Sequence, residues 1–139
     1  MAENPQKPQR PRPLSPFTTI FRWPVTMATS ITHRVTGIGL AMGTVLLAWW
    51  LIAIASGPES YATVTSLAAS WIGQIVLFGF AWSLAYHLLN GIRQLAWDMG
   101  YGFDVKTANQ TSWLVIVLSV LLAAAAFALA YTGHGGYIA

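Results

Sequence analysis

The chain has 139 residues, of which 55% are hydrophobic and only 8% are charged. A soluble globular domain carries about 25% charged residues, so much of this chain's surface must face lipid. The formal net charge of +3 comes from few, scattered groups, which argues against a nucleic-acid partner. The absence of cysteine excludes disulfides, Cys-ligated iron–sulfur clusters and thioether-attached haem on this chain.

Residues 1–16 are polar and rich in proline. They lack the apolar core that a secretion signal requires, so we expect no cleaved signal peptide. Such a composition is typical of a short disordered segment. We therefore predict an N-terminal arm over residues 1–20, followed by a transmembrane domain over residues 21–131.

Three long stretches without a charged residue follow the arm. A helix of about 20 apolar residues crosses a hydrocarbon core of roughly 30 Å, and each stretch is long enough for one crossing. The pattern predicts an all-α membrane protein with three transmembrane helices, at about residues 28–55, 69–93 and 109–131.

The connection between the first two crossings contains a helix start. Pro58 suits the first turn of a helix, and Glu59 suits its positive end. We expect a short interfacial helix from about Pro58 to Ala68. The third crossing carries almost no polar chemistry and is suited to packing.

The basic residues predict the orientation. All seven fall on one side of the predicted topology, and the positive-inside rule makes that side cytoplasmic. The tail at 132–139, which contains His134, is then periplasmic. The basic residues are Lys7, Arg10, Arg12, Arg22, Arg34, Arg93 and Lys106.

Polar residues at membrane depth are costly and usually functional. Here they gather at the start of the first crossing and the end of the second. Because these two helices are antiparallel, both groups lie toward the cytoplasmic side and form one polar site. Its members are Ser30, His33, Arg34, Tyr86, His87, Asn90, Arg93 and Gln94.

His87 is the most informative member of this site. It precedes Arg93, which we take as the membrane boundary, by about 9 Å along the helix. Gly91, one turn further on, leaves room for a flat, bulky group. Imidazole is an axial ligand of haem iron, so haem ligation is one interpretation. The other is a histidine hydrogen-bonded across a helix interface.

A six-coordinate haem needs a second axial ligand. We expect His33 to lie too near the membrane edge to share one iron with His87, and His134 to lie on the far side. The chain is therefore one ligand short. This favours a subunit of a heteromeric helix bundle over a self-contained bis-histidine cytochrome.

Ser30 and Arg34 are four residues apart and share a helix face. A hydroxyl beside a guanidinium can bind a carbonyl oxygen or an anionic group. The alternatives are that Ser30 caps the helix and that Arg34 anchors the chain at lipid phosphates. Gly39 and Gly43 have the small-xxx-small spacing of close helix packing.

Asp98 lies five residues after Arg93 and is a candidate ion-pair partner for it.

Two segments together resemble the cytochrome b subunit family of succinate dehydrogenase. The first comprises Arg12-Pro-Leu-Ser-Pro16 and Ser30-Ile-Thr-His-Arg-Val-Thr-Gly37, and the second is His87-Leu-Leu-Asn-Gly-Ile-Arg-Gln-Leu-Ala-Trp-Asp98. Their order, their spacing and the three predicted spans also match. The resemblance covers about residues 12–131.

The resemblance implies roles for individual residues. His87 matches the axial ligand of haem b, with the other ligand supplied by a second anchor subunit. Ser30 and Arg34 match residues that line the ubiquinone site, and His33 and Arg34 match residues near the haem propionates. Gln94 departs from the family, since many relatives have histidine there.

The resemblance also implies a membrane anchor in the bacterial inner membrane. FAD and iron–sulfur clusters would belong only to a flavoprotein subunit and an iron–sulfur subunit, and this chain alone would not be catalytic. Two other functions remain open: the anchor of a fumarate reductase, and a non-catalytic membrane scaffold without haem.

Overall fold

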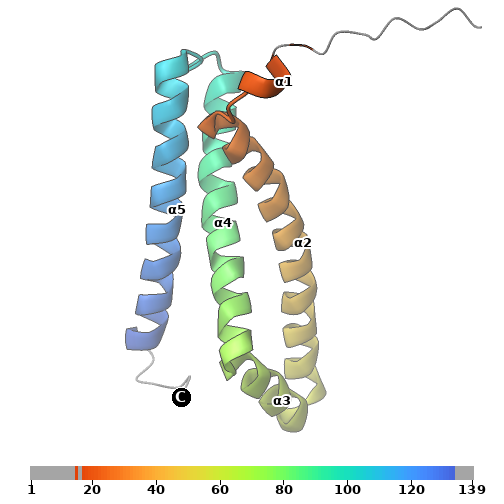
Figure 1. The fold of residues 1–139 in the computed structure, drawn as a ribbon. Coiled ribbons are helices and arrows are strands. Elements are labelled where there is room, and N and C mark those ends of the chain that lie inside the picture. The colour runs from red at the N-terminus through yellow and green to blue at the C-terminus, as the bar shows by residue number, and fades with distance from the viewer. Residues whose placement is uncertain (1–14, 16, 134–139) are drawn as a thin grey trace, which may run out of the picture.

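The computed structural model describes residue 15 and residues 17–133. Most of the expected N-terminal arm, and the tail residues from His134 onward, lie outside the described residues. The elements in chain order are α1 (Phe17–Ile20), α2 (Val25–Ser56), α3 (Pro58–Ala69), α4 (Trp71–Asp98) and α5 (Val105–Gly133). Figure 1 shows α2, α4 and α5 running alongside one another, with α3 joining α2 to α4 at one end.

The described part of the chain is helical, and α2, α4 and α5 are long and apolar enough to cross a membrane. The prediction of an all-α protein with three spans and a short helix before the second is confirmed. The spans are longer than expected at the polar end. α2 begins at Val25 and α4 continues to Asp98, which adds about one turn to each.

Local sequence explains where the helices begin and end. Pro24 precedes α2 and cannot donate a backbone hydrogen bond. Gly57, at φ 112°, makes the turn between α2 and α3, and Pro58 then occupies the first turn of α3. The Ser70 hydroxyl caps α4 by accepting from the Gly73 N–H.

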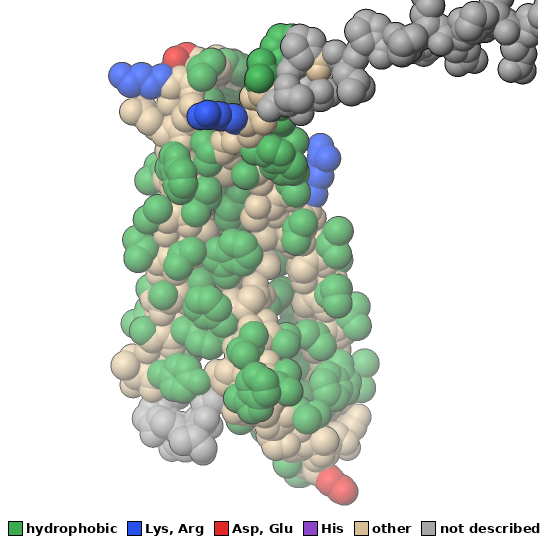
Figure 2. Space-filling model, viewed as in Figure 1, with side chains coloured by type: hydrophobic (Ala, Val, Ile, Leu, Met, Phe, Trp, Pro, Cys, Tyr) green, Lys and Arg blue, Asp and Glu red, His purple; other side chains and the backbone are tan. Residues whose placement is uncertain are grey.

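The distribution of polar and apolar side chains is that of a membrane protein. In the most apolar 18-residue segment of each span, only 11–17% of the segment is buried within the chain. Most of its surface is therefore left for lipid or partner subunits. Hydrophobic side chains cover the face of the bundle shown in Figure 2. The fully buried side chains are instead mainly polar or small. They include Thr29, Thr36, Ser112 and Ser119.

α5 packs on α4 through small residues spaced three or four positions apart: Ala108, Ser112, Val115, Ser119 and Ala123. The Trp82 indole N–H of α4 donates to the Ser119 hydroxyl at 3.2 Å. Hydrogen bonds of this kind stabilise helix contacts in membranes. The expectation that the third crossing carries almost no polar chemistry was therefore wrong in this respect.

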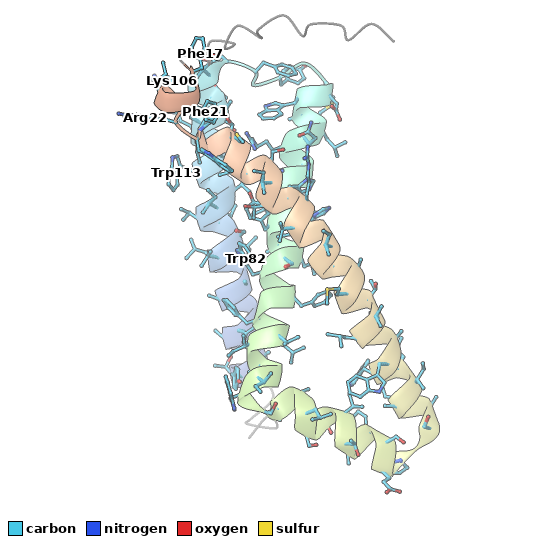
Figure 3. The ribbon with its side chains drawn as sticks, turned by 45° about the vertical axis from the view of Figure 1, so that its right-hand side comes forward. Phe17, Phe21, Arg22, Trp82, Lys106 and Trp113 are labelled. Atoms are coloured by element: carbon cyan, nitrogen blue, oxygen red, sulfur yellow. The ribbon has the colours of Figure 1, made fainter. Side chains whose placement is uncertain are left out.

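α2 and α4 meet through the two glycines whose spacing indicated close packing. A Cβ atom on Gly43 would lie 2.0 Å from Cε2 of Phe80, and one on Gly39 would lie 3.2 Å from Oγ of Ser83. Each glycine therefore admits a side chain of α4. Toward α3 the two helices spread apart, as the views in Figures 1 and 3 agree in showing.

Candidate functional site

His87 of α4 contacts the backbone of α2 close to the polar ends of both helices. Its Nδ1 lies 3.2 Å from the carbonyl oxygen of His33. A carbonyl oxygen only accepts hydrogen bonds, so Nδ1 carries the proton. The Thr36 hydroxyl donates to the same carbonyl at 3.0 Å, so its proton is not available to Nδ1. In the neutral imidazole Nε2 then carries the free lone pair, which suits ligation of a metal through Nε2.

The ring of His33 stacks on the ring of His87. The ring centroids are 4.0 Å apart and the planes differ by 22°. The expectation that His33 lies too near the membrane edge to reach the level of His87 was therefore wrong. α2 begins further toward the N-terminus than expected, which places His33 in its third turn. Two stacked imidazoles present their faces to each other, so in this arrangement their nitrogens do not point at one shared iron.

Two glycines next to His87 differ in the space around them. A Cβ atom on Gly37 would lie 3.2 Å from Cε1 of His87, so an alanine here would require the imidazole or α2 to shift by a few tenths of an ångström. A Cβ atom on Gly91 would meet nothing within 4 Å. The expected room one turn from His87 is present beside Gly91.

These residues fit an axially ligated haem in three respects. His87 has the correct tautomer, the neighbouring helix surface at Gly91 is open, and the buried Nε2 of His33 has no hydrogen-bond partner within the described residues. A buried polar atom of this kind is rare unless a bound group pairs with it. Within residue 15 and residues 17–133, no group of three or more His, Asp or Glu side chains forms a metal site.

Ser30 and Arg34 are exposed, and neither makes a hydrogen bond or ion pair with the described residues. Ser30 lies inside α2, so it does not cap the helix. At 3.6 residues per turn, Ser30 and Arg34 are turned roughly 60° and 100° from His33 in the same direction. Both therefore lie on one flank of α2, next to the stacked histidines.

Arg93 lies inside the bundle and not at its boundary. Its side chain is only 9% exposed. It donates to the Thr29 hydroxyl of α2, to the Asn90 side chain and to the Thr111 hydroxyl of α5, at 3.2, 2.9 and 3.1 Å. The Trp97 ring lies 4.1 Å from its guanidinium carbon. The expected pairing with Asp98 is absent from the described structure.

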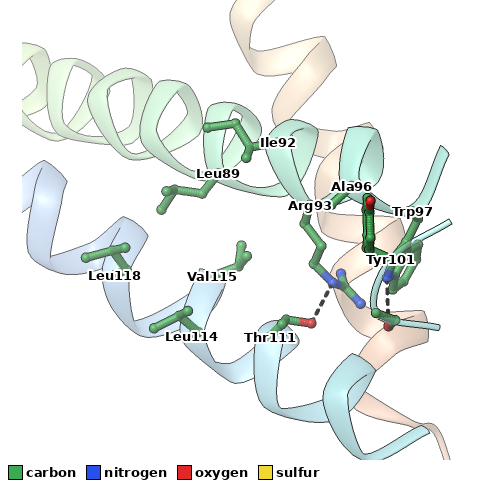
Figure 4. A pocket seen from close by; sticks show the side chains of 11 residues that line it. Leu89, Ile92, Arg93, Ala96, Trp97, Tyr101, Thr111, Leu114, Val115 and Leu118 are labelled. Carbon is green, nitrogen blue, oxygen red and sulfur yellow. Dashed lines mark hydrogen bonds between the residues drawn. The ribbon is translucent and has the colours of Figure 1, made fainter. Parts of the chain in front are cut away.

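Figure 4 shows Arg93 reaching from α4 to Thr111 of α5, beside an apolar pocket of about 290 Å³ between these helices. Sequence reasoning missed the role of Arg93 because a basic residue near the end of a span suggests a boundary marker. The sequence did contain a signal for a buried Arg93. Tyr86, Asn90 and Arg93 are spaced by four and three residues, which places all three on one polar face of α4.

Tyr86 connects the two parts of the site. It is 1% exposed, and its hydroxyl donates to the Thr29 carbonyl at 3.0 Å. Tyr86 and His87 thus donate to two α2 carbonyls, those of Thr29 and His33, which lie one turn apart. Gln94 is exposed.

The fold and the site define a multi-pass helical membrane protein with a histidine-centred polar site near one end of its bundle. The chain belongs to the family of transmembrane subunits of succinate dehydrogenase and fumarate reductase, whose model matches residues 8–126. The family resemblance indicated by the sequence motifs is confirmed.

Individual relatives agree with this assignment. The chain is 44% identical over 112 residues to the succinate dehydrogenase cytochrome b556 subunit of Paracoccus denitrificans, which covers 81% of this chain and 86% of that protein. It is 44% identical over 111 residues to the subunit of the same name from Rickettsia prowazekii, and this match covers 80% of this chain and 86% of that protein. The human mitochondrial succinate dehydrogenase cytochrome b560 subunit is 38% identical over 114 residues, a match that covers 79% of this chain and 66% of that protein.

Proposed function

We propose that this chain is a membrane-anchor cytochrome b subunit of a succinate:ubiquinone oxidoreductase in the bacterial inner membrane. In this proposal Nε2 of His87 is one axial ligand of haem b, and a second anchor subunit supplies the other. The observation that carries the proposal is the hydrogen bond from Nδ1 of His87 to the His33 carbonyl, because it leaves Nε2 with a free lone pair.

When bound, haem b would supply one-electron redox chemistry inside the membrane. The residues around it would hold and orient it. The His33 carbonyl fixes the ring of His87, and Gly37 allows the close approach of α2. The side chains of His33 and Arg34 would pair with the haem propionates. The buried, unpaired Nε2 of His33 supports this role.

Ubiquinone would bind beside the exposed flank of α2. The Ser30 hydroxyl would donate to a quinone carbonyl oxygen, and the Arg34 guanidinium would stabilise negative charge that develops on the quinone oxygens. Both side chains are exposed, and neither has a polar partner among the described residues. Their donors are therefore available to a substrate and to the residues of a partner subunit.

The remaining cofactors would belong to soluble partners: FAD to a flavoprotein subunit, and iron–sulfur clusters to a second subunit. With no cysteine, this chain has no thiolate for a cluster. The soluble subunits would dock at the cytoplasmic end of the bundle. Arg22 and Lys106 lie at one end of the bundle, which supports a cytoplasmic N-terminus under the positive-inside rule (Figure 3).

The test is to isolate the complex from native membranes by a tag on this chain and to record its reduced-minus-oxidised visible spectrum and subunit composition. The proposal predicts a sharp b-type band together with a flavoprotein, an iron–sulfur protein and a second membrane subunit. If the subunits co-purify without a haem band, the proposed anchor role stands, but His87 is not a haem ligand. A well-folded preparation with neither haem nor co-purifying subunits would favour a non-catalytic membrane scaffold.

A further inference from the structure

Arg93 joins three helices through acceptors that carry no formal charge. Thr29 lies on α2, Asn90 on α4 and Thr111 on α5, and Arg93 also donates to the Ala108 carbonyl of α5 at 3.4 Å. No carboxylate pairs with it within residues 17–133. Burying a guanidinium without a counter-charge is costly, so its presence inside the bundle indicates a specific role for this side chain.

The two threonine acceptors are oriented by their own helices. The Thr29 hydroxyl donates to the Thr26 carbonyl at 2.9 Å, and the Thr111 hydroxyl donates to the Thr107 carbonyl at 2.9 Å. Each proton is thus directed back along its helix, and the oxygen lone pairs face Arg93. The planar fork of the guanidinium meets these fixed acceptors in one relative position of the three helices.

Thr29 receives hydrogen bonds from two residues of α4 that are seven positions apart. Arg93 donates to its hydroxyl, and Tyr86 donates to its carbonyl. Thr29 lies one turn before His33, whose carbonyl accepts from His87. A sliding movement of α2 along α4 that separates Arg93 from Thr29 would therefore also separate His87 from the His33 carbonyl.

We propose that Arg93 is a positioning residue. By linking Thr29 and Thr111 it sets the register of α2 against α4, and through that register it holds the ring of His87 in the orientation needed for axial ligation. The ligation part of this inference rests on the proposed function, whereas the register part concerns the contacts of this chain alone.

The register can be measured without reference to haem by an engineered disulfide. A Cβ atom on Gly39 would lie 3.7 Å from Cβ of Ser83, which is within the range for a disulfide. The native chain has no cysteine, so the double variant Gly39→Cys/Ser83→Cys carries the only thiols on this subunit. Its rate of oxidation in the whole complex, in native membranes, reports how often α2 and α4 are in register.

The experiment compares this rate in three further backgrounds. Arg93→Met should slow cross-linking by about tenfold, in line with the contribution of hydrogen bonds to a charged group. Arg93→Lys should slow it as well, because an ammonium keeps the charge but loses the fork. Arg22→Met, which removes an exposed arginine, is the control and should leave the rate unchanged.

Milder variants keep the test decisive if Arg93→Met does not accumulate. Thr29→Val and Thr111→Val each remove one acceptor while keeping the side-chain shape, and both should slow cross-linking. Thr44→Val is their control, since the Thr44 hydroxyl bonds only within α2. The visible and electron paramagnetic resonance spectra of the haem should change in the slowed variants and stay unchanged in the controls.

Unchanged cross-linking in Arg93→Met and in both threonine variants would overturn the inference. So would slowed cross-linking with an unaltered low-spin haem signal, because register would then not position His87. If neither the native complex nor any variant contained haem, the proposed role of His87 as a haem ligand would fail, whereas the anchor role would stand. The cross-linking rates would in that case still decide whether Arg93 sets the register.

Discussion

His33 and His87 are 54 residues apart in the chain, and their rings stack with centroids 4.0 Å apart. The same pair is joined a second time by the hydrogen bond from Nδ1 of His87 to the His33 carbonyl. One contact fixes the position of the ring face and the other fixes the tautomer. The orientation of His87 therefore depends on how closely α2 and α4 approach each other at this level.

The two glycines beside His87 should respond differently to an added methyl group. In Gly37→Ala the new Cβ would lie 3.2 Å from Cε1 of His87, so the ring must shift and the haem spectrum should change. In Gly91→Ala the chain itself offers no clash, so the complex should assemble. If haem occupies the space beside Gly91, this variant should have reduced haem content. Normal haem content in Gly91→Ala would show that the group does not lie there.

Gly43→Ala should destabilise the packing of α2 on α4. The added Cβ would lie 2.0 Å from Cε2 of Phe80, and overpacking of this kind costs roughly 1–3 kcal/mol. Gly79→Ala is the matched control in α4, where the added Cβ meets nothing within 4 Å and alanine favours the helix by up to about 1 kcal/mol. Thermal unfolding of the purified complex measures both. Equal melting temperatures of the two variants would show that the contact with Phe80 is not important for stability.

Arg34→Ala should separate the two partial activities of the complex. Reduction of ubiquinone should fall by about 10²-fold, the scale for removing one donor that stabilises developing charge. Succinate oxidation by an artificial dye should persist, because the flavin site belongs to a different subunit in the proposal. Glu59→Ala, which removes an exposed charge from α3 at the other end of the bundle, should change neither activity. Parallel loss of both activities in Arg34→Ala would indicate failed assembly and not a quinone site.

Asp104 should make the start of α5 sensitive to pH. Its carboxylate accepts from the Thr107 hydroxyl and from the backbone N–H groups of Thr107 and Lys106. These hydrogen bonds, chiefly the one from the Thr107 hydroxyl, hold the pKa of Asp104 below its ordinary value. A lowered pKa in the folded state stabilises that state above the ordinary carboxyl pKa of about 4, and this contribution is lost as pH falls through the lowered value.

The corresponding measurement compares Asp104→Ala with the native chain at several pH values. The native complex should melt at the higher temperature near pH 7, and the difference should shrink once the pH is below the lowered pKa of Asp104. Asp98→Ala, which removes another exposed carboxylate, serves as the control. A difference that persists unchanged into strong acid would mean that the charge of Asp104 does not stabilise α5.

The spans could be predicted because uncharged stretches of this length have few alternatives to a membrane helix. The start of α3 followed from Gly57 and Pro58, whose backbone preferences are local properties. The depth of His33 could not be predicted in this way. It depends on where α2 begins, and the helix includes residues 25–27, which the sequence pattern left outside the span.

The role of Arg93 was also beyond the sequence pattern. A basic residue near the end of an apolar stretch normally marks the interface, and nothing local shows that Thr29 and Thr111 will lie beside it. Those neighbours come from α2 and α5, so they are a consequence of tertiary packing. The buried Ser112 and Ser119 carried a clearer signal, since their spacing places them on one face of α5.

The most direct test of the proposed haem site is the low-spin haem signal of the assembled complex in His87→Leu, measured beside His33→Leu. His87→Leu should abolish the b-type low-spin signal while the subunits remain together. His33→Leu should keep the signal with altered spectral or redox properties, because it removes a neighbour of the ligand and not the ligand itself. An intact low-spin b-type signal in His87→Leu would contradict the assignment of His87 as an axial ligand.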